Sequence, residues 1–302
     1  MTSASSAVPS AVPAAAPAAR RKGRPGASVS PLGAVGVYAV LIAGALLVLG
    51  PFVLSTMTAF KTPGQLATSS KLAPPWPVTL ENFERLFDGG LVDFSRAIGV
   101  TAGYVAIVLV GQLVFSILAA YAFARLRFPG RDALFWVYLS TLMVPAVVTM
   151  VPLYLMISEA GMRNTFWGLV LPYLFGSPYA IFLLREYFRG IPQDLVDAAR
   201  LDGAGHWRIL TRIVLPLSRP IIATLGIITV VTHWNNFMWP LIITSGPEWG
   251  VITTATASVQ TQFNGNWTIV TAATTIAMLP LIILFSVFNK QIVSSIAITG
   301  FR

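Results

Sequence analysis

Long runs without a charged residue constrain the fold of this chain more than any other feature. The runs lie between Arg24 and Lys61, Arg96 and Arg125, Asp132 and Glu159, Arg163 and Arg185, Arg219 and Glu248, and Glu248 and Lys290. An α-helix needs about 20 apolar residues to cross a bilayer, where every backbone polar group must be satisfied within the structure. The pattern therefore predicts an all-α membrane protein with six transmembrane helices.

The expected spans cover approximately residues 34–59, 98–124, 133–157, 166–184, 221–244 and 267–288. A transmembrane β-barrel would instead show segments of about ten residues with strict alternation. Residues 105–110 are apolar without interruption, and only 10% of all residues are charged. We therefore expect residues 34–302 to form one transmembrane domain. Prolines such as Pro145 and Pro240 predict bends, either in a moving bundle that lines a cavity or as ordinary packing irregularity.

The distribution of Lys and Arg predicts the orientation of these helices. With the amino terminus inside the cell, fifteen of the 20 cationic residues fall in cytoplasmic segments. Because Lys and Arg concentrate on the cytoplasmic side, both termini are expected there. The net charge of +9 then marks the cytoplasmic face and does not indicate a nucleic-acid partner. We expect a multi-pass protein of the bacterial inner (plasma) membrane, in contact with lipid.

Residues 1–33 are rich in Ala, Pro and Ser and predict a disordered cytoplasmic tail. The pair Arg20 and Arg21 raises the alternative of a secretory or twin-arginine signal. The apolar run that follows is too long for a signal peptide and is not followed by a small-residue cleavage site. We therefore expect the tail and first span to stay attached.

Few residues of the chain are suited to catalysis or metal binding. It has no Cys and two His, which excludes disulfides, thiolate chemistry and Cys/His zinc sites. No G-x-x-x-x-G-K-[ST] phosphate-binding loop is present. The expected spans hold His233 but no Asp, Glu or Cys. We therefore expect no enzymatic activity, no metal site and no cofactor on this chain, so any nucleotide is handled by another polypeptide.

The loop of residues 185–219, between the fourth and fifth expected spans, is far longer than a tight connection needs. Pro192 suits a first helical position, residues 194–201 predict a short helix, and Gly203 suits its end. Residues 206–215 predict a second, amphipathic helix, which we expect Pro216 to break.

The spacing of residues in this loop resembles a known motif. It reads Asp197-Ala198-Ala199, three residues, Gly203, nine residues, Ile213-Val214-Leu215-Pro216. This resembles the EAA loop of bacterial ABC importer permeases, whose pattern is E-A-A, three residues, G, nine residues, I-x-L-P. Only Asp197 departs from the pattern, with Asp in place of Glu.

The rest of the chain, from about Val35, resembles the smaller permease of carbohydrate importers of the maltose and glycerol-phosphate type. Residues 234–241 resemble that subgroup's W-N-x-F-x-W-P-L stretch, and residues 296–302 resemble its short Gly-containing cytoplasmic tail. The resemblance implies that the loop is a cytoplasmic coupling helix seated in a groove of a separate ATPase subunit. It also implies four kinds of partner: a second permease, a pair of ATPase subunits that hold ATP, an extracytoplasmic solute-binding protein and a sugar-like substrate.

Polar and aromatic residues in the fifth expected span suggest where a solute would pass. Trp234, Asn235, Asn236 and Phe237 combine hydrogen-bonding groups and rings, which suit a carbohydrate. The alternative is that they hold helices together. His233 is expected to be a satisfied interface residue, because the spans offer it no carboxylate partner.

Two rival functions remain open at this point. A self-sufficient, ion-coupled secondary transporter also uses a helical bundle with a polar cluster, although it often binds its ion through an acid near the midplane. An ABC permease for a solute other than a sugar would share the same loop.

Overall fold

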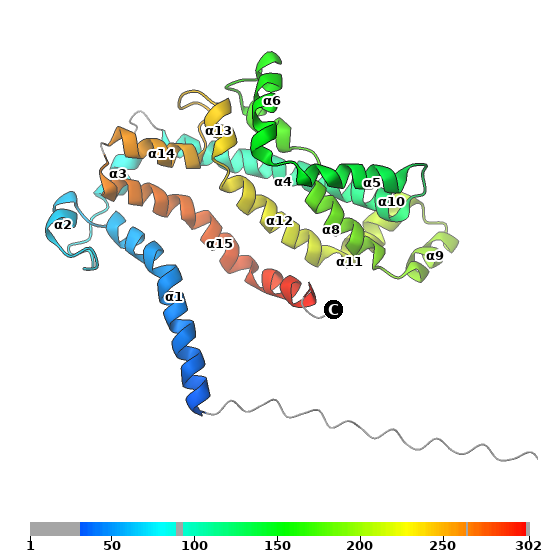
Figure 1. Ribbon diagram of the computed structural model, residues 1–302, viewed down its shortest axis with the longest axis horizontal. Coiled ribbons are helices and arrows are strands. Elements are labelled where there is room, and N and C mark those ends of the chain that lie inside the picture. Colours follow the sequence, from blue (N-terminus) through cyan, green and yellow to red (C-terminus); the bar gives the residue numbers. More distant parts are fainter. Residues whose placement is uncertain (1–30, 89–92, 264, 300–302) are drawn as a thin grey trace, which may run out of the picture. The chain divides into compact units, whose positions relative to one another are not determined.

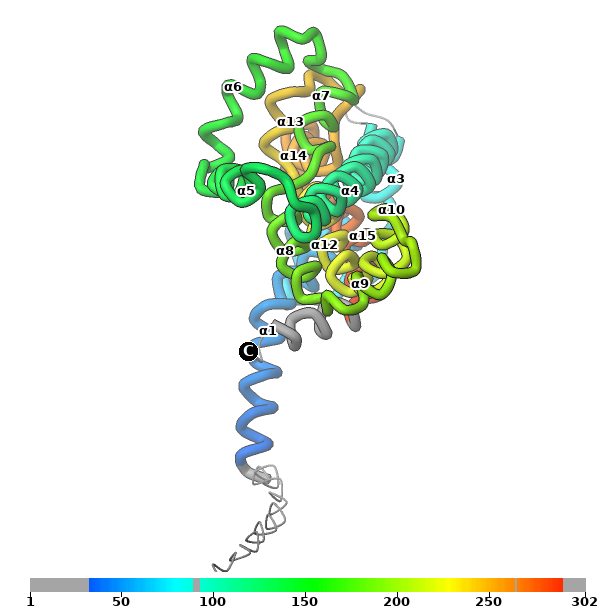
Figure 2. The backbone as a smooth tube through the Cα atoms, turned by 90° about the vertical axis from the view of Figure 1, so that its right-hand side faces the viewer, coloured from blue at the N-terminus to red at the C-terminus, as the bar shows by residue number. Residues whose placement is uncertain are grey.

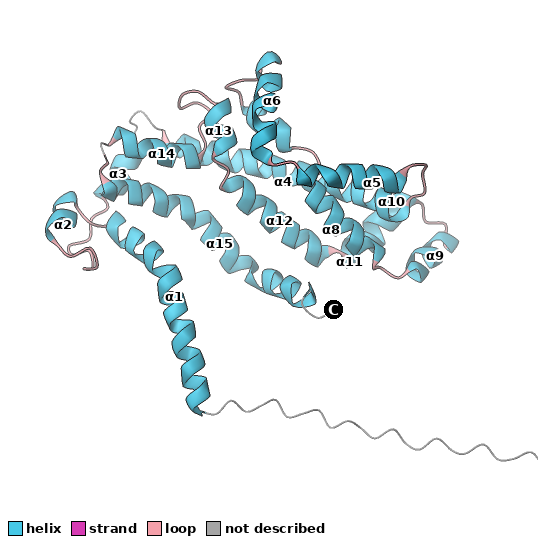
Figure 3. Ribbon diagram, viewed as in Figure 1, coloured by secondary structure: helices cyan, strands magenta, loops and turns pink. Residues whose placement is uncertain are grey.

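The computed structural model describes residues 31–88, 93–263 and 265–299. Every regular element among these residues is helical (Figure 3). The expected tail, residues 1–33, lies outside the described residues except for its last three, which begin the first helix. The all-α class is therefore confirmed for the described part of the chain.

The chain divides into two compact units after Pro51, and α1 (Pro31–Ala59) contains this boundary. The helix covers the first expected span, 34–59, and is long and apolar enough to cross a membrane. Pro51 lies inside the helix without ending it.

The second unit holds the remaining helices, which Figure 1 labels. They are α2 (Pro63–Thr68), α3 (Glu81–Phe87), α4 (Phe94–Arg125), α5 (Arg131–Ser140), η1 (Thr141–Met143), α6 (Ala146–Glu159), α7 (Phe166–Val170), η2 (Leu171–Tyr173), α8 (Pro178–Arg189), α9 (Gln193–Leu201), α10 (His206–Ile209), η3 (Leu210–Val214), α11 (Leu215–Leu217), α12 (Arg219–Trp234), α13 (Met238–Ile243), α14 (Ile252–Gln262) and α15 (Trp267–Thr299).

The helix α4 packs against several other helices of the second unit. Its first turn is capped by Asp93, whose carboxylate accepts a hydrogen bond from the Arg96 N–H at 2.9 Å. Along its length α4 contacts α8, α12 and α14, and α12 in turn contacts α15 (Figures 1 and 2). The residues of the second expected span, 98–124, all lie within this one continuous helix.

Two separate apolar clusters form the core of this unit, and α4 takes part in both. The first core cluster includes Val100, Tyr104, Leu169, Trp239 and Ile252. The second core cluster includes Ala120, Leu184, Phe188, Ile209, Val214 and Leu225. Because α4 passes through both clusters, a displacement at one end of this helix is carried to the other.

Small and polar residues join the two clusters. A side-chain carbon added to Gly111 of α4 would lie 2.6 Å from the carbonyl oxygen of Leu174, so only glycine permits this approach. The Thr229 hydroxyl of α12 donates to the Gln112 amide oxygen at 3.0 Å. Small residues and side-chain hydrogen bonds of this kind are typical contacts between helices in membranes.

The third expected span, 133–157, is broken at Pro145, one of the prolines for which a bend was predicted. The helices of residues 131–143 and α6 are bent by 100° relative to each other. Val144 is extended, with φ −81° and ψ 119°. Because proline disfavours the helical conformation of the residue before it, Pro145 explains the break.

The fifth expected span, 221–244, is also interrupted. The helix α12 ends at Trp234, and α13 begins at Met238. Pro240 has no N–H to donate to the Asn236 carbonyl, one turn earlier. That carbonyl instead accepts a hydrogen bond from the Thr253 hydroxyl at 2.7 Å. The break is therefore compensated by a side chain from the segment that follows.

The structure contains a helix that the charge-free runs did not predict. The helix α14 is 11 residues long, too short to span a bilayer. It packs against α4 and α15, and the Ile252 N–H donates to the Thr101 hydroxyl at 2.8 Å. Its buried residues Ile252, Ala255 and Val259 follow a helical period, which was the available sequence signal.

Four helices of the described chain are long and apolar enough to cross a membrane, or up to six if each bent pair is one span. One candidate covers residues 166–189 and includes the fourth expected span, 166–184. The sixth expected span, 267–288, lies within α15. The higher count equals the predicted number of spans, but its fifth candidate pairs residues 206–217 with 219–234, whereas the fifth expected span was 221–244.

Replacement of Gly168 by Ala is expected to destabilise the first core cluster. An added Cβ would lie 2.3 Å from the Met162 carbonyl oxygen, and overpacking of this kind costs about 1–3 kcal/mol. We expect a lower thermal unfolding midpoint of the detergent-solubilised protein, measured by tryptophan fluorescence. Gly99→Ala is the matched control, because nothing lies within 4 Å of its added Cβ. An equal midpoint for Gly168→Ala and wild type would contradict the packing described.

Candidate functional site

The loop after α8 contains the short helix α9, which includes the Asp197-Ala198-Ala199 part of the motif. The helix begins at Gln193, one residue after Pro192, which is extended with ψ 132°. Val196 is buried, whereas Asp197 and Ala198 are exposed and Ala199 packs on the second core cluster. The Asp197 carboxylate pairs with Arg200 at 3.2 Å and accepts from the Gln193 amide at 3.0 Å.

Glycine is required where α9 ends. Gly203 has φ +79°, a conformation that costs other L-residues about 1–2 kcal/mol. Its N–H donates to the Arg200 carbonyl and the Ala204 N–H donates to the Ala199 carbonyl, both at 2.9 Å. These two bonds form a Schellman motif, which reverses the chain direction at a helix end. The predicted stop at Gly203 is confirmed.

The second half of the motif lies on the helical stretch α10, η3 and α11. The Ile209 and Val214 side chains are buried in the second core cluster, whereas Arg208 and Arg212 are exposed. Ile213 and Leu215 are half-buried. The amphipathic character predicted for residues 206–215 is therefore confirmed.

Pro216 does not end this second helix, contrary to the sequence prediction. The helix runs on to Leu217 and then bends by 78° into α12. Pro216 has no N–H for the Arg212 carbonyl, and residues 210–214 form a π-helical turn instead. Wider turns of this kind let a helix continue past a missing donor, so the break occurs after Leu217.

Arg125, the last residue of α4, holds the start of the loop. Its guanidinium donates to the carbonyls of Phe188 and Ile191, and to the Gln193 side chain at 2.6 Å. The Tyr121 hydroxyl, one turn earlier, lies 3.4 Å from Nδ1 of His206. Two consecutive turns of α4 therefore contact both ends of the segment that carries α9.

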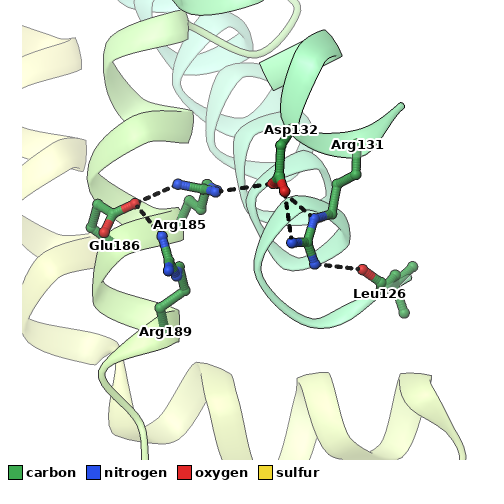
Figure 4. Close-up of polar contacts among 6 residues, drawn as sticks. All are labelled: Leu126, Arg131, Asp132, Arg185, Glu186 and Arg189. Carbon is green, nitrogen blue, oxygen red and sulfur yellow. Dashed lines mark hydrogen bonds and ion pairs between the residues drawn. The ribbon is translucent and has the colours of Figure 1, made fainter. Parts of the chain in front are cut away.

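A chain of ion pairs joins α5 to α8 beside this loop (Figure 4). Arg185 lies 3.5 Å from Asp132 and 2.6 Å from Glu186, and its guanidinium carbon lies 3.9 Å from the centre of the Phe135 ring. Arg131 pairs with Asp132 at 3.0 Å, and Arg189 pairs with Glu186 at 3.4 Å. Because Arg185 is largely buried against the ring, it fixes the side-by-side position of α5 and α8.

Exposed apolar side chains surround α9. Leu201 is 90% exposed and Trp207 is 70% exposed, and Leu195 is also exposed. Exposed apolar residues that are grouped in this way, at the edge of a well-packed unit, are typical of contact surfaces for other molecules.

The polar cluster of the fifth span divides into residues with different contacts. Trp234 is buried and donates its indole N–H to the Ala277 carbonyl of α15 at 3.0 Å. Asn236 is half-buried and donates to the Tyr104 hydroxyl at 3.2 Å. Asn235 is exposed and its amide bonds to the Val231 carbonyl of its own helix at 2.8 Å. Phe237 is half-buried in the break between α12 and α13.

His233 belongs to a buried polar contact between α12 and α4. Its Nδ1 lies 2.9 Å from the Tyr104 hydroxyl, and its ring is 4.8 Å from that of Tyr173, centre to centre. The histidine is thus satisfied by a tyrosine. No cluster of three or more His, Cys, Asp or Glu that would hold a metal ion occurs among the described residues.

Sequence reasoning missed the partners of both candidate sites. Arg125 ends a charge-free run, and a cation at the end of a span is a natural partner for nearby loop carbonyls, which was the available sequence signal. Tyr104 and Tyr121 lie 17 positions apart in an apolar helix, and only the fold shows which contacts each makes.

Comparisons with known proteins show which family the chain belongs to. Residues 112–298 match the family model described as binding-protein-dependent transport system inner membrane component. An arabinooligosaccharides transport system permease protein from Halalkalibacterium halodurans is 31% identical over 76% of this chain and 81% of its own length. An sn-glycerol-3-phosphate transport system permease protein from Yersinia pestis is 32% identical, over 85% of this chain and 93% of its own.

A third relative and two solved structures add to the match. The relative is a diacetylchitobiose uptake system permease protein from Streptomyces coelicolor, 29% identical over 88% of both chains. A chain of a bacterial ABC transporter involved in alginate import has a TM-score of 0.76 and 22% identity, over 86% of this chain and 96% of its own. A complex of the alginate transporter with an alginate-bound periplasmic protein gives a TM-score of 0.60, at 19% identity, over 85% of this chain and 94% of its own.

The family match covers more than half of the chain, and the structural matches show the same fold. The resemblance that the loop motif indicated is therefore confirmed. This chain belongs to the family of inner-membrane components of binding-protein-dependent transport systems, and it is a multi-pass membrane permease.

Proposed function

We propose that this chain is one of two permease subunits of an ATP-driven ABC importer for a sugar or sugar derivative. In this proposal α9 receives the movement of a separate ATPase subunit and passes it to the membrane helices. The observation that carries the proposal is α9 itself. This short helix exposes Ala198, and the apolar side chains of Leu201 and Trp207 beside it are also exposed. Its first residue, Gln193, is hydrogen-bonded to Arg125 of α4.

The proposed orientation has both termini and α9 in the cytoplasm. It rests on the bias of Lys and Arg toward that side. Arg125, Arg189 and Arg200 are among the cations that gather at the α9 end of the second unit. In this orientation a solute-binding protein would deliver substrate at the opposite face.

The connections of α9 explain how a push on it would reach the spans. It is preceded by α8 and followed by the helices that lead into α12, and Arg125 links it to α4. These three helices pack on one another, so they would shift together. Packed helices of this kind move as rigid elements between two stable arrangements, which fits alternating outward and inward access.

The proposed substrate class follows from the relatives. Their names refer to arabinooligosaccharides, sn-glycerol-3-phosphate and diacetylchitobiose, all of them polyhydroxylated or derived from such compounds. Neutral hydrogen-bonding groups beside aromatic rings suit these solutes. Asn235 and Phe237 are the best candidates to line the path, because Trp234 and Asn236 are engaged in holding helices.

Reconstitution tests the proposal as a whole. Vesicles that contain this chain with a second permease, an ATPase pair and a binding protein should accumulate sugar only when ATP is supplied. The ATP is held by the partner ATPase subunits. Accumulation by this chain alone, with only an ion gradient, would establish the secondary-transporter alternative. ATP-dependent uptake of a solute that is not a sugar or sugar derivative would change the proposed substrate class but leave the ATP-driven importer unchanged.

Gly203→Pro is expected to abolish ATP-dependent uptake without preventing membrane insertion. Proline fixes φ near −65°, whereas Gly203 has φ +79° and donates its N–H to Arg200. Gly203→Ala should reduce uptake only in part. Gly205→Ala is the control, because Gly205 has φ −74° and open space around it. Uptake and membrane content are measured together, and normal uptake by Gly203→Pro would contradict the role of α9.

Arg125→Gln is expected to loosen α9. Loss of the bonds to the Phe188 and Ile191 carbonyls removes two interactions of a charged donor, each about 1.5 kcal/mol, so amide exchange should rise by a factor on the order of one hundred. Hydrogen exchange of residues 191–202 measures this effect. Arg189→Gln is the control, because Arg189 is exposed and pairs only with Glu186 among the described residues. Unchanged exchange in Arg125→Gln would mean that α9 is held by its apolar contacts alone.

Asn235→Ala is expected to raise the apparent KM for sugar several-fold while leaving stability unchanged, since the side chain is exposed and bonds only to its own helix. Trp234→Ala should instead destabilise the protein by about 3–5 kcal/mol, as expected for loss of a buried Trp. Uptake kinetics and thermal unfolding separate the two effects. An unchanged KM in Asn235→Ala would remove Asn235 from the path.

A further inference from the structure

A cleft of about 870 Å³ lies beside α9, and its lining is strongly cationic. The charged and titratable residues of the lining are Arg125, Arg127, Arg131, Arg200, His206 and a single acid, Asp197. They come from the end of α4, the loop that joins α4 to α5, the start of α5, α9 and the start of α10, and Figure 1 shows these helices at the same end of the second unit.

The positive charge of this cleft is not neutralised within the described chain. Asp197 is paired with Arg200, and Arg131 is paired with Asp132, which lies outside the cleft lining. The partners of Arg125 are neutral carbonyls and the Gln193 amide, and its buried Nε has no partner among the described residues. Arg127 is exposed and has no hydrogen bond or ion pair within the described ranges. The cleft therefore retains two guanidinium groups, those of Arg125 and Arg127, that form no ion pair with a carboxylate among the described residues.

The position of the cleft limits the source of a complementary anion. Its wall includes Ala124 and Leu126, at the end of the 32-residue apolar helix α4. The amphipathic segment that begins at His206 starts at its edge, and Trp207 beside it is exposed. Residues 94–125 are long and apolar enough to cross a membrane, so the cleft lies at the end of a candidate span. It combines cations with an apolar wall at the place where lipid headgroups meet such a helix.

We propose that this cleft binds the phosphate of an anionic phospholipid headgroup. Arg recognises phosphate through paired N–H donors, and basic pockets between membrane helices are suited to anionic headgroups. The volume of about 870 Å³ holds a headgroup with its glycerol, which would lie against Ala124 and Leu126. A bound headgroup would bridge the end of α4 and α9, so the lipid would strengthen the attachment that Arg125 already makes.

The test is native mass spectrometry of the detergent-solubilised full chain with added lipid. Phosphatidylglycerol should be retained in preference to phosphatidylcholine, and Arg127→Gln should weaken that retention about fivefold, the effect of one cation near an anionic headgroup. Arg127→Lys should restore it, since Lys also binds phosphate. Arg212→Gln, which removes an exposed cation outside the cleft, should behave as wild type.

Each outcome decides the proposal independently of transport. Equal retention of the two lipids by wild type, or equal retention of phosphatidylglycerol by wild type and Arg127→Gln, overturns it. If millimolar inorganic phosphate displaces both lipids and neither lipid is preferred, the cleft is a site for free anions, and the proposal of a lipid ligand is overturned. Loss of ATPase co-purification in Arg127→Gln without any change in lipid retention would assign the cleft to an acidic segment of the partner protein.

Discussion

The need to satisfy backbone groups where helices break determines how this permease is assembled. In the fifth span Pro240 has no N–H for the Asn236 carbonyl, and the Thr253 hydroxyl donates a hydrogen bond to that carbonyl instead. At the other end of the second unit, the carbonyls of Phe188 and Ile191, where α8 ends, bond to Arg125. An unpaired carbonyl costs several kcal/mol in a membrane, and in both of these places the partner comes from another segment. Breaks in this chain are therefore also points of attachment between helices.

These attachments give α4 its central role. The helix carries Tyr104 toward His233 and Asn236 in the first core cluster, and Arg125 toward the loop at the other end. It is continuous over 32 residues without an internal proline, unlike the third and fifth spans. A continuous helix packed against the interrupted fifth span is suited to transmit a displacement, because it has no proline hinge to absorb the displacement. The mechanical link between α9 and the polar cluster thus runs along the least interrupted helix of the second unit.

Much of this was predictable from the sequence, and the failures have physical causes. Charge-free runs locate helices because charge is costly in lipid, and Gly203 marks the end of α9 because its φ is positive. The charge-free runs do not reveal α14, because this helix packs on α4 and is too short to span a membrane. Pro216 was expected to break a helix that instead widens into a π turn. Trp234 and Asn236 looked like path residues, but their partners, Ala277 and Tyr104, depend on tertiary packing.

The two candidate sites differ in how much the chain itself completes them. In the polar cluster most groups already have partners within the described chain, and Asn235 bonds only to its own helix. Around α9, by contrast, Leu201, Trp207 and the Arg127 guanidinium all face outward. Grouped apolar side chains that are exposed are typical of surfaces that another molecule covers, and the exposed Arg127 guanidinium is available to an anion. The α9 end therefore depends on partners for its final structure, and lipid and ATPase would meet there on adjoining surfaces.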